Sequence, residues 1–171
     1  MRRRKQKPLQ EHEAVVESLS HDGKGICRVE GKVIFVSGAL VGERIRFSFR
    51  PHKKSHDEGL LIEVLEASED RVQPRCSAAG VCGGCSLQHM SESSQIHAKQ
   101  QVLLDNLKQI GKVEPLSVLP PLQSSHWNYR RKARLGVKFV PKKGGVLVGF
   151  REKQSGFLAV MDSCEVLDER F

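Results

Sequence analysis

The stretch Lys24-Gly-Ile-Cys-Arg-Val-Glu-Gly-Lys-Val-Ile-Phe-Val36 decides the fold of the first part of the chain. It contains two short apolar runs, and the pair Glu30-Gly31 separates them. Short runs rich in β-branched residues and bounded by glycine are typical of β-strands joined by turns. The stretch therefore predicts two consecutive short strands.

Further runs of this kind lie on both sides of the stretch, at residues 14–19, 44–50 and 59–65. The run at 44–50 alternates strictly, which puts Ile45, Phe47 and Phe49 on one face and Arg44, Arg46 and Arg50 on the other. Five short strands with glycine turns predict a small closed barrel of the OB type over residues 10–70. Cys27 lies between apolar neighbours in this barrel, so we expect it to be a buried structural thiol.

The charge of the chain points to a polyanionic partner. Its 171 residues include 28 Lys and Arg against 20 Asp and Glu, a formal net charge of +8. Nucleic acid is the first candidate for such a partner. Five of the basic residues fall within the first seven positions, and we expect residues 1–9 to be a disordered tail, either solubilising or phosphate-binding.

Other classes of protein are excluded by the distribution of apolar residues. No stretch approaches the roughly 20 apolar residues of a membrane span. The basic start of the chain is not followed by the apolar segment of a secretory signal. Five cysteines are an odd number, and without export a disulfide framework is not expected. We therefore expect a cytoplasmic protein whose cysteines are thiols or metal ligands.

One helix is predicted in the second half of the chain. It begins at Ser91 or Ser94, runs to Ile110 and has Gly111 at its C-terminal cap. Its apolar residues recur at helical spacing and predict a packing stripe made of Ile96, Leu103, Leu107 and Ile110.

A basic strand is predicted after the helix, at residues 129–139. Its odd positions from 133 onward are apolar, and its even positions carry the basic residues Arg130, Lys132, Arg134 and Lys138. Period two predicts one core face and one cationic face. Residues 146–151 are expected to pair with it as a hairpin, and residues 157–160 to add a third strand. The fold class is thus mainly β with one helix (α+β), in which residues 71–171 hold a cysteine loop, the helix and the start of a second sheet.

Three cysteines lie close together in Cys76-Ser-Ala-Ala-Gly-Val-Cys82-Gly-Gly-Cys85, and Cys164 is available as a distant fourth ligand. Zinc sites favour two pairs with short internal spacing, and only one such pair occurs here. An iron–sulfur cluster accepts three near ligands and one far one. The spacing slightly favours the cluster, but His89 leaves a three-Cys, one-His zinc site as an alternative.

These residues carry a resemblance to a known family. The pattern Cys76-x5-Cys82-Gly-Gly-Cys85-x2-Gln88-His89 resembles the cluster loop of bacterial uracil-5 RNA methyltransferases, and residues 129–134 are similar to the strand that follows the helix in those enzymes. Residues 23–28 resemble the RNA-binding TRAM barrel of the ribosomal members. The resemblance covers residues 10–168. It implies a [4Fe-4S] cluster on Cys76, Cys82, Cys85 and Cys164, and S-adenosylmethionine-dependent formation of 5-methyluridine in 23S ribosomal RNA.

The chain departs from the family in one respect. Family members carry a nucleophilic cysteine, a carboxylate and a cofactor site on a C-terminal Rossmann-like domain. No glycine pair here opens a helix after a buried strand, as a cofactor loop requires. We therefore expect an N-terminal portion without catalytic residues, inactive alone, which binds S-adenosylmethionine only through the absent domain.

The expected partner is ribosomal RNA, bound by a monomer without a membrane. The RNA-binding candidates are the two cationic faces, made of Arg44, Arg46, Arg50, Arg130, Lys132, Arg134 and Lys138. Gln88 and His89 are candidates for either an RNA contact or a structural role. The aromatic residues Phe35, Trp127, Tyr129 and Phe150 are weaker candidates, because such residues are more often core than stacking platforms. Two alternative functions remain open: a stand-alone zinc-bound RNA-binding module and an iron–sulfur electron carrier.

Overall fold

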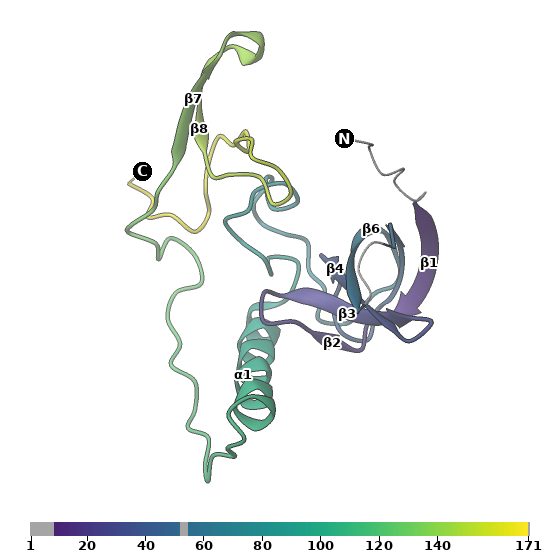
Figure 1. The fold of residues 1–171 in the computed structure, drawn as a ribbon. Helices are drawn as coiled ribbons and strands as arrows, with labels where there is room; N and C mark the ends of the chain where they lie inside the picture. The colour runs from purple at the N-terminus through teal and green to yellow at the C-terminus, as the bar shows by residue number, and fades with distance from the viewer. Residues whose placement is uncertain (1–8, 52–54, 171) are drawn as a thin grey trace. The chain divides into compact units, whose positions relative to one another are not determined.

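The computed structural model describes residues 9–51 and 55–170 (Figure 1). The predicted tail therefore lies outside the described residues, except for Leu9. The described chain is mainly β with one α-helix. Its elements are β1 (Gln10–Val15), β2 (Ser18–Leu19), β3 (Lys24–Val29), β4 (Lys32–Ser37), β5 (Arg44–Phe49), β6 (His56–Glu66), α1 (Glu92–Gln109), β7 (Gly136–Val140), the short 3-10 helix η1 (Pro141–Lys143) and β8 (Gly145–Gly149).

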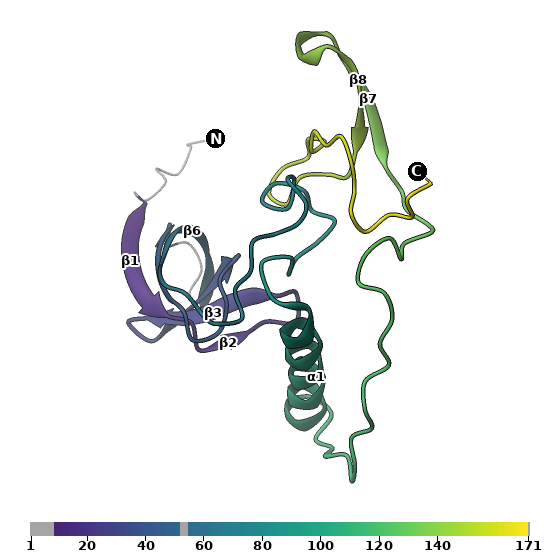
Figure 2. The same cartoon turned by 180° about the vertical axis from the view of Figure 1, so that it is seen from behind.

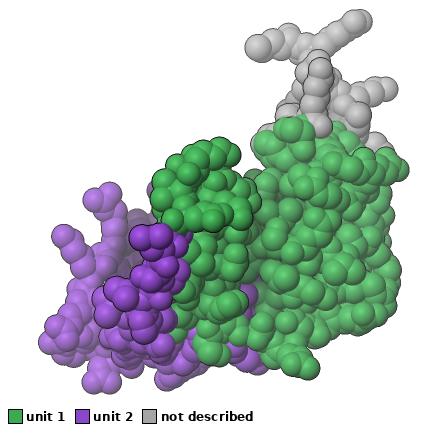
Figure 3. Space-filling model, turned by 90° about the horizontal axis from the view of Figure 1, so that it is seen from below, with its two compact units in different colours: residues 1–71, 93–114 green, residues 72–92, 115–171 purple. Residues whose placement is uncertain are grey.

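The chain divides into two compact units, which Figure 3 colours separately. The first unit comprises residues 1–71 and 93–114, and the second comprises residues 72–92 and 115–171. Residues 93–114, which we had expected to belong with the cysteine loop, are thus grouped with the barrel. Each unit is described below by itself.

The first unit contains a six-stranded sheet that closes on itself. The strand order is β1-β5-β6-β4-β3-β2, and only the pairing of β4 with β6 is parallel. The two strands at the ends of this order, β1 and β2, are joined by only Val16 and Glu17. Val16 N donates to Glu43 O at 2.9 Å, and Glu17 N donates to Ile26 O at 2.8 Å. The same short segment is therefore hydrogen-bonded to the chain beside β5 on one side and to β3 on the other, which closes the sheet into a barrel.

The barrel core consists of the apolar residues that the strand pattern placed on the inner face. Ile45 and Phe47 are fully buried and Phe49 nearly so, as the alternation predicted. The prediction for Cys27 is also confirmed, because it is fully buried. The other buried residues of this core are Val16, Ile34, Val36, Ala39, Ile45, Phe47 and Phe49. One prediction was wrong in detail: residues 14–19 do not form one strand, because β1 ends at Val15 and β2 begins at Ser18.

A buried ion pair lies beside the barrel core, and the sequence analysis did not identify it. The carboxylate of Glu43 is fully buried and pairs with Arg71 through two atoms, with Arg71 Nη2 2.7 Å from Glu43 Oε2. Arg71 Nη2 also donates to Gly38 O at 2.7 Å. Arg71 is the last residue of the segment 1–71, and these contacts attach it to Gly38 and Glu43 of the barrel.

The helix α1 forms close to the predicted range but buries none of its residues. Leu103 is 58% exposed and Ile110 is 79% exposed, so the predicted packing stripe is not a core contact among the described residues. The C-terminal cap also differs from the prediction. Lys112, not Gly111, takes the left-handed conformation, with φ of 54°.

The second unit contains the hairpin of β7 and β8, shown in Figure 2. The hairpin pairing is confirmed, with Val137 opposite Val148 and Phe139 opposite Val146. The extent of the strand was wrong, because β7 begins at Gly136 and residues 131–135 have no regular structure. Its expected core face is exposed, since Val137 is 69% and Phe139 is 68% exposed. Residues 157–160 form only a single bridge, between Arg151 and Leu158.

Within the described ranges, α1 is too polar to cross a membrane.

Candidate metal centre and nucleic-acid interface

The cysteine loop is folded by its own backbone and is attached to the segment after β8. Ala79 N donates to Cys76 O at 3.1 Å, and Cys82 N donates to Ala78 O at 2.7 Å. Gly83 N then donates to Arg151 O at 2.8 Å. On the other side, the Lys153 ammonium donates to Ala79 O at 2.7 Å. These bonds hold Cys76 and Cys82 on one folded turn.

A small core supports this turn. Ala78, Cys82 and Ala159 are buried, and Phe150 and Met161 pack against them. The absence of side chains at Gly83 and Gly84 is required by the packing. A Cβ at Gly83 would lie 2.9 Å from Arg151 O, and one at Gly84 would lie 3.2 Å from the Phe150 ring and 3.4 Å from the Cys82 sulfur. The glycines thus allow close contact between loop, backbone and sulfur.

The four predicted ligands influence one another electrostatically. Burial raises the pKa of the Cys82 thiol, and the neighbouring Cys85, Cys164 and Cys76 raise it further. The Gly84 amide opposes this effect, because it donates to Cys82 Sγ at 3.4 Å. Cys164, which is distant in the sequence, is thus among the groups that act electrostatically on the Cys82 thiol. A cation that neutralised four such thiolates would relieve their mutual repulsion.

The donor set fits a thiophilic metal or cluster, but the side chains have not converged. Among the described residues, no three His, Cys, Asp or Glu side chains already have the arrangement of a metal site. The chemistry of the site rests on four sulfurs, which suit zinc or iron–sulfur ligation. Thiol ligands commonly take their final positions when the metal binds. Cys27 is excluded from the set, because it is buried in the other unit and burial raises its pKa to about 11.

The cationic face of β5 is paired with carboxylates. Arg44 contacts Glu13 and Glu66, and Arg46 contacts Glu13 and Glu63, with N···O distances of 2.8 to 3.1 Å. These carboxylates lie on β1 and β6, the strands that flank β5 in the sheet. The face is therefore much less positive than the sequence of β5 suggests. Arg50 lies just beyond β5 and is exposed.

The basic residues near β7 are in a different situation. Lys132, Arg134 and Lys138 are exposed and form no ion pair with any residue in the described ranges. Arg130 is half-buried, and its guanidinium carbon lies 5.9 Å from the Tyr129 ring centroid. Its backbone pairs with Val166 and Asp168. Because residues 131–135 lie outside β7, these basic side chains do not form the predicted strand face, but unlike Arg44 and Arg46 they have no carboxylate partner among the described residues.

The remaining candidates have mainly structural contacts. Gln88 Oε1 accepts from Cys76 N at 3.2 Å, so it supports the cysteine loop. His89 is buried, and its carbonyl accepts from Val72 N. Phe35 stacks edge-on against His56 on the barrel, and Phe150 packs on the loop core. Tyr129 is 50% exposed and is the most accessible of the aromatic candidates.

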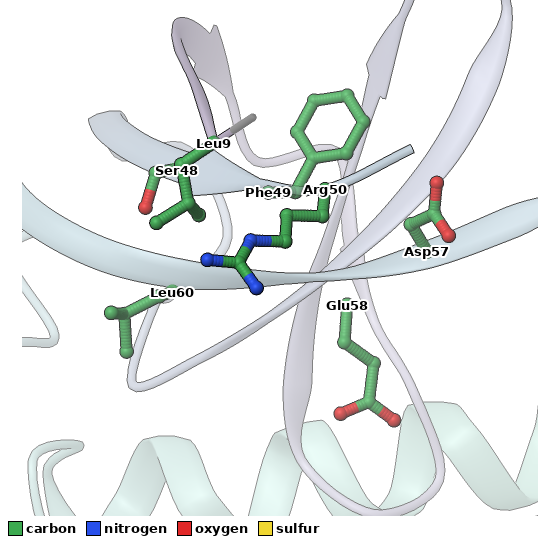
Figure 4. Close-up of a pocket in the computed structure, with 7 residues that line it drawn as sticks. All are labelled: Leu9, Ser48, Phe49, Arg50, Asp57, Glu58 and Leu60. Carbon is green, nitrogen blue, oxygen red and sulfur yellow. The ribbon is translucent and has the colours of Figure 1, made fainter. Parts of the chain in front are cut away.

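The barrel also carries a pocket, shown in Figure 4. Apolar and charged side chains share its wall, and the guanidinium of Arg50 extends across it. Its lining consists of Leu9, Ser48, Phe49, Arg50, Asp57, Glu58 and Leu60.

Comparison with known proteins agrees with this architecture. The family model of the TRAM domain matches residues 5–46. The chain contains a TRAM domain. In the structure, the part of this TRAM domain that is described runs from Leu9 through β1 to β4 and into β5, that is, most of the barrel.

Homologues extend the similarity beyond the TRAM domain. A 23S rRNA (uracil(1939)-C(5))-methyltransferase RlmD of Alkalilimnicola ehrlichii is 48% identical over 99% of this chain, and RlmD of Legionella pneumophila is 49% identical over 98%. RlmD of Methylococcus capsulatus is 48% identical over 96%. The chain spans only 37 to 38% of the length of these relatives.

A solved structure shares the fold. The tRNA (uracil-54, C5)-methyltransferase of Pyrococcus abyssi, crystallised with S-adenosyl-L-homocysteine, superposes with a TM-score of 0.60 at 23% identity. The match covers 92% of this TRAM-containing chain and 33% of the archaeal chain.

Proposed function

We propose that this chain is the RNA-binding and [4Fe-4S]-binding N-terminal part of a cytoplasmic, monomeric methyltransferase that uses S-adenosylmethionine to form 5-methyluridine in 23S ribosomal RNA. The observation that carries the proposal is the alignment of nearly the whole chain with RlmD enzymes at 48 to 49% identity. RNA binding is supported by the TRAM domain and by the basic residues near β7, which have no ion pair with any residue that the structure describes.

The division of labour follows from the residues that are present. No side chain of this chain is given a catalytic role, and methyl transfer is assigned to the part of the longer relatives that this chain does not span. We expect the chain alone not to methylate RNA. Its own contribution is to hold phosphates with Arg130, Lys132, Arg134 and Lys138 and to present the barrel surface.

Cys76, Cys82, Cys85 and Cys164 would hold the cluster. When bound, a cluster with four cysteine ligands supplies cross-links between distant segments and leaves no open coordination position for substrate. The four thiols, the glycine turn and the hydrogen bond from the Gly84 amide to Cys82 Sγ support this assignment. A zinc site with His89 is the competing assignment, and a stand-alone zinc module or an electron carrier does not account for the similarity to RlmD.

The proposal is tested by metal analysis of the chain purified without oxygen. We expect about four irons with matching acid-labile sulfide per chain. Cys76→Ala and Cys164→Ala should each lose most of this iron, because each removes one ligand. Cys27→Ala, which removes a thiol outside the set, should retain it. Stoichiometric zinc without sulfide would overturn the cluster assignment.

A further inference from the structure

We infer that the ion pair between Arg75 and Glu165 positions the metal centre by holding the Cys164 segment against the cysteine loop before any metal binds. The inference rests on the proposed function, because it takes the four cysteines as ligands of one centre. Both residues are positioning residues, since neither supplies a donor atom to the metal.

The location of the pair carries the argument. Arg75 immediately precedes Cys76, and Glu165 immediately follows Cys164. Arg75 Nε lies 2.7 Å from Glu165 Oε2. The pair therefore connects the residues next to the first and the last of the four proposed ligands. Both residues belong to the second compact unit.

The Glu165 end of this connection is fixed by backbone bonds. Asn128 N donates to Glu165 O at 3.0 Å, and Arg130 N donates to Val166 O at 2.9 Å. When the side-chain amide of Asn128 is oriented with its nitrogen toward the carbonyls of Glu165 and Leu167, it donates to both of them. The segment after Cys164 thus lies along residues 128–130, and the carboxylate of Glu165 joins this arrangement to the loop.

The Arg75 end is held by an aromatic contact. The guanidinium carbon of Arg75 lies 5.2 Å from the Trp127 ring centroid, and the Trp127 indole donates to Glu92 at 2.8 Å. A planar guanidinium against an aromatic face loses less freedom when it forms an ion pair than an unsupported side chain does. The backbone amide of Cys76, the next residue, donates to Gln88 Oε1 at 3.2 Å. The contact at Arg75 therefore restricts the first ligand as well.

The need for such a connection follows from chain length. The first three ligands lie within ten positions, whereas Cys164 follows much later in the sequence. Closing a long loop costs conformational entropy, and an existing contact at its end removes part of that cost from metal binding. Without it, the loop would often present only three thiols to the metal.

The test measures iron release from the anaerobically reconstituted full chain to a ferrous-iron chelator. Glu165→Gln should release iron about threefold to fivefold faster, as expected for one half-exposed pair. Glu165→Arg, which places two cations together, should release it about tenfold faster. The double variant Arg75→Glu with Glu165→Arg should return to within about twofold of the unmodified chain, since it restores the attraction. Glu169→Arg makes the same charge change at an exposed position nearby and should have no effect.

A second measurement works without metal. In the metal-free Cys82→Ser, Cys85→Ser chain, glutathione disulfide oxidises Cys76 and Cys164 to one disulfide and is itself reduced to two glutathione molecules. The equilibrium reports the effective concentration of one thiol near the other. We expect this effective concentration to fall about tenfold with Glu165→Arg and to recover when Arg75→Glu is combined with Glu165→Arg.

The outcomes separate the two proposals. Equal iron release from Glu165→Arg and Glu169→Arg, or a charge swap that fails to restore retention, overturns the positioning role and leaves the cluster assignment standing. If the unmodified chain takes up no iron, the cluster assignment fails, and the disulfide equilibrium alone decides whether Arg75 and Glu165 hold Cys164 near Cys76.

Discussion

At the scale of single residues, the carboxylate of Glu43 has the clearest energetic consequence. It is fully buried and accepts from Leu40 N at 2.8 Å and from Arg71 through both oxygens. Burial alone would raise the pKa of Glu43, but the hydrogen bonds from Arg71 and Leu40 outweigh it and bring the pKa below its ordinary value of 4.5. Glu43 is therefore charged at neutral pH and depends on Arg71 for compensation.

Replacing Arg71 with Met should destabilise the barrel by about 3 kcal/mol at neutral pH, because it leaves a buried charge without a partner. The pKa of Glu43 is lower in the folded than in the unfolded chain. The stabilisation from this group is thus present above the ordinary pKa and is lost as the pH falls through the folded pKa. Urea unfolding followed by circular dichroism should show the difference between the two chains shrinking as the pH falls towards and below the ordinary pKa of Glu43, because protonation removes the uncompensated charge.

The double variant Glu43→Gln with Arg71→Met is the control for this prediction. It removes the charge as well as its partner, so it should recover part of the lost stability. A difference between Arg71→Met and the unmodified chain that stays constant across the pH range would contradict the role given to Glu43.

At the scale of elements, the pairing of β5 with β6 depends on one position without a side chain. Gly59 of β6 lies opposite Phe49 in the register. A Cβ there would lie 3.0 Å from atoms of the Phe47 and Val36 side chains. Three core side chains, those of Phe47, Val36 and Ile34, therefore occupy the space beside Gly59, so β6 can take its place in the sheet only without a side chain at this position.

Gly59→Ala should cost about 1 to 3 kcal/mol, since neighbouring core side chains must move to admit a methyl group. Thermal unfolding followed by circular dichroism should show a lower Tm for the barrel. Gly80→Ala is the matched control, because a Cβ at Gly80 meets no atom within 4 Å. An unchanged Tm for Gly59→Ala would mean that the barrel core is looser than its contacts indicate.

At the scale of the whole molecule, the net charge of +8 is not distributed as the sequence alone suggests. The arginines of β5 are neutralised by carboxylates of the adjacent strands, whereas Lys132, Arg134 and Lys138 remain exposed and unpaired among the described residues. Under the proposed function, the basic residues near β7 should dominate the salt-dependent part of RNA binding.

Binding can be measured with a 23S rRNA fragment that contains uridine 1939, the position in the names of the relatives, over a series of salt concentrations. Replacing Lys132, Arg134 and Lys138 together with Gln should lower the slope of log K against log salt by about two, at roughly 0.7 per phosphate contact. Replacing Arg44 and Arg46 with Gln should change it by less than about one, because these side chains already pair with Glu13, Glu63 and Glu66. Equal losses from both sets would contradict this assignment.

The amino-acid sequence by itself determined the features that depend on neighbouring residues. Alternation over 44–50 predicted the buried face of β5, apolar neighbours predicted the burial of Cys27, and the glycines between Cys76 and Cys85 predicted a tightly folded loop. Each of these follows from the period of a strand or from glycine in a short loop, and both act within a few residues.

Only the tertiary structure decided which distant groups meet. The neutralisation of Arg46 depends on the placement of β1 and β6 beside β5, and the pairing of Arg75 with Glu165 depends on the return of the chain after β8. The prediction at β7 was wrong for the same reason: alternation predicted a buried face, but no described segment covers Val137 and Phe139. Periodicity specifies which side chains share a face, but burial and charge compensation require a second segment, and its position is set by contacts far apart in the sequence.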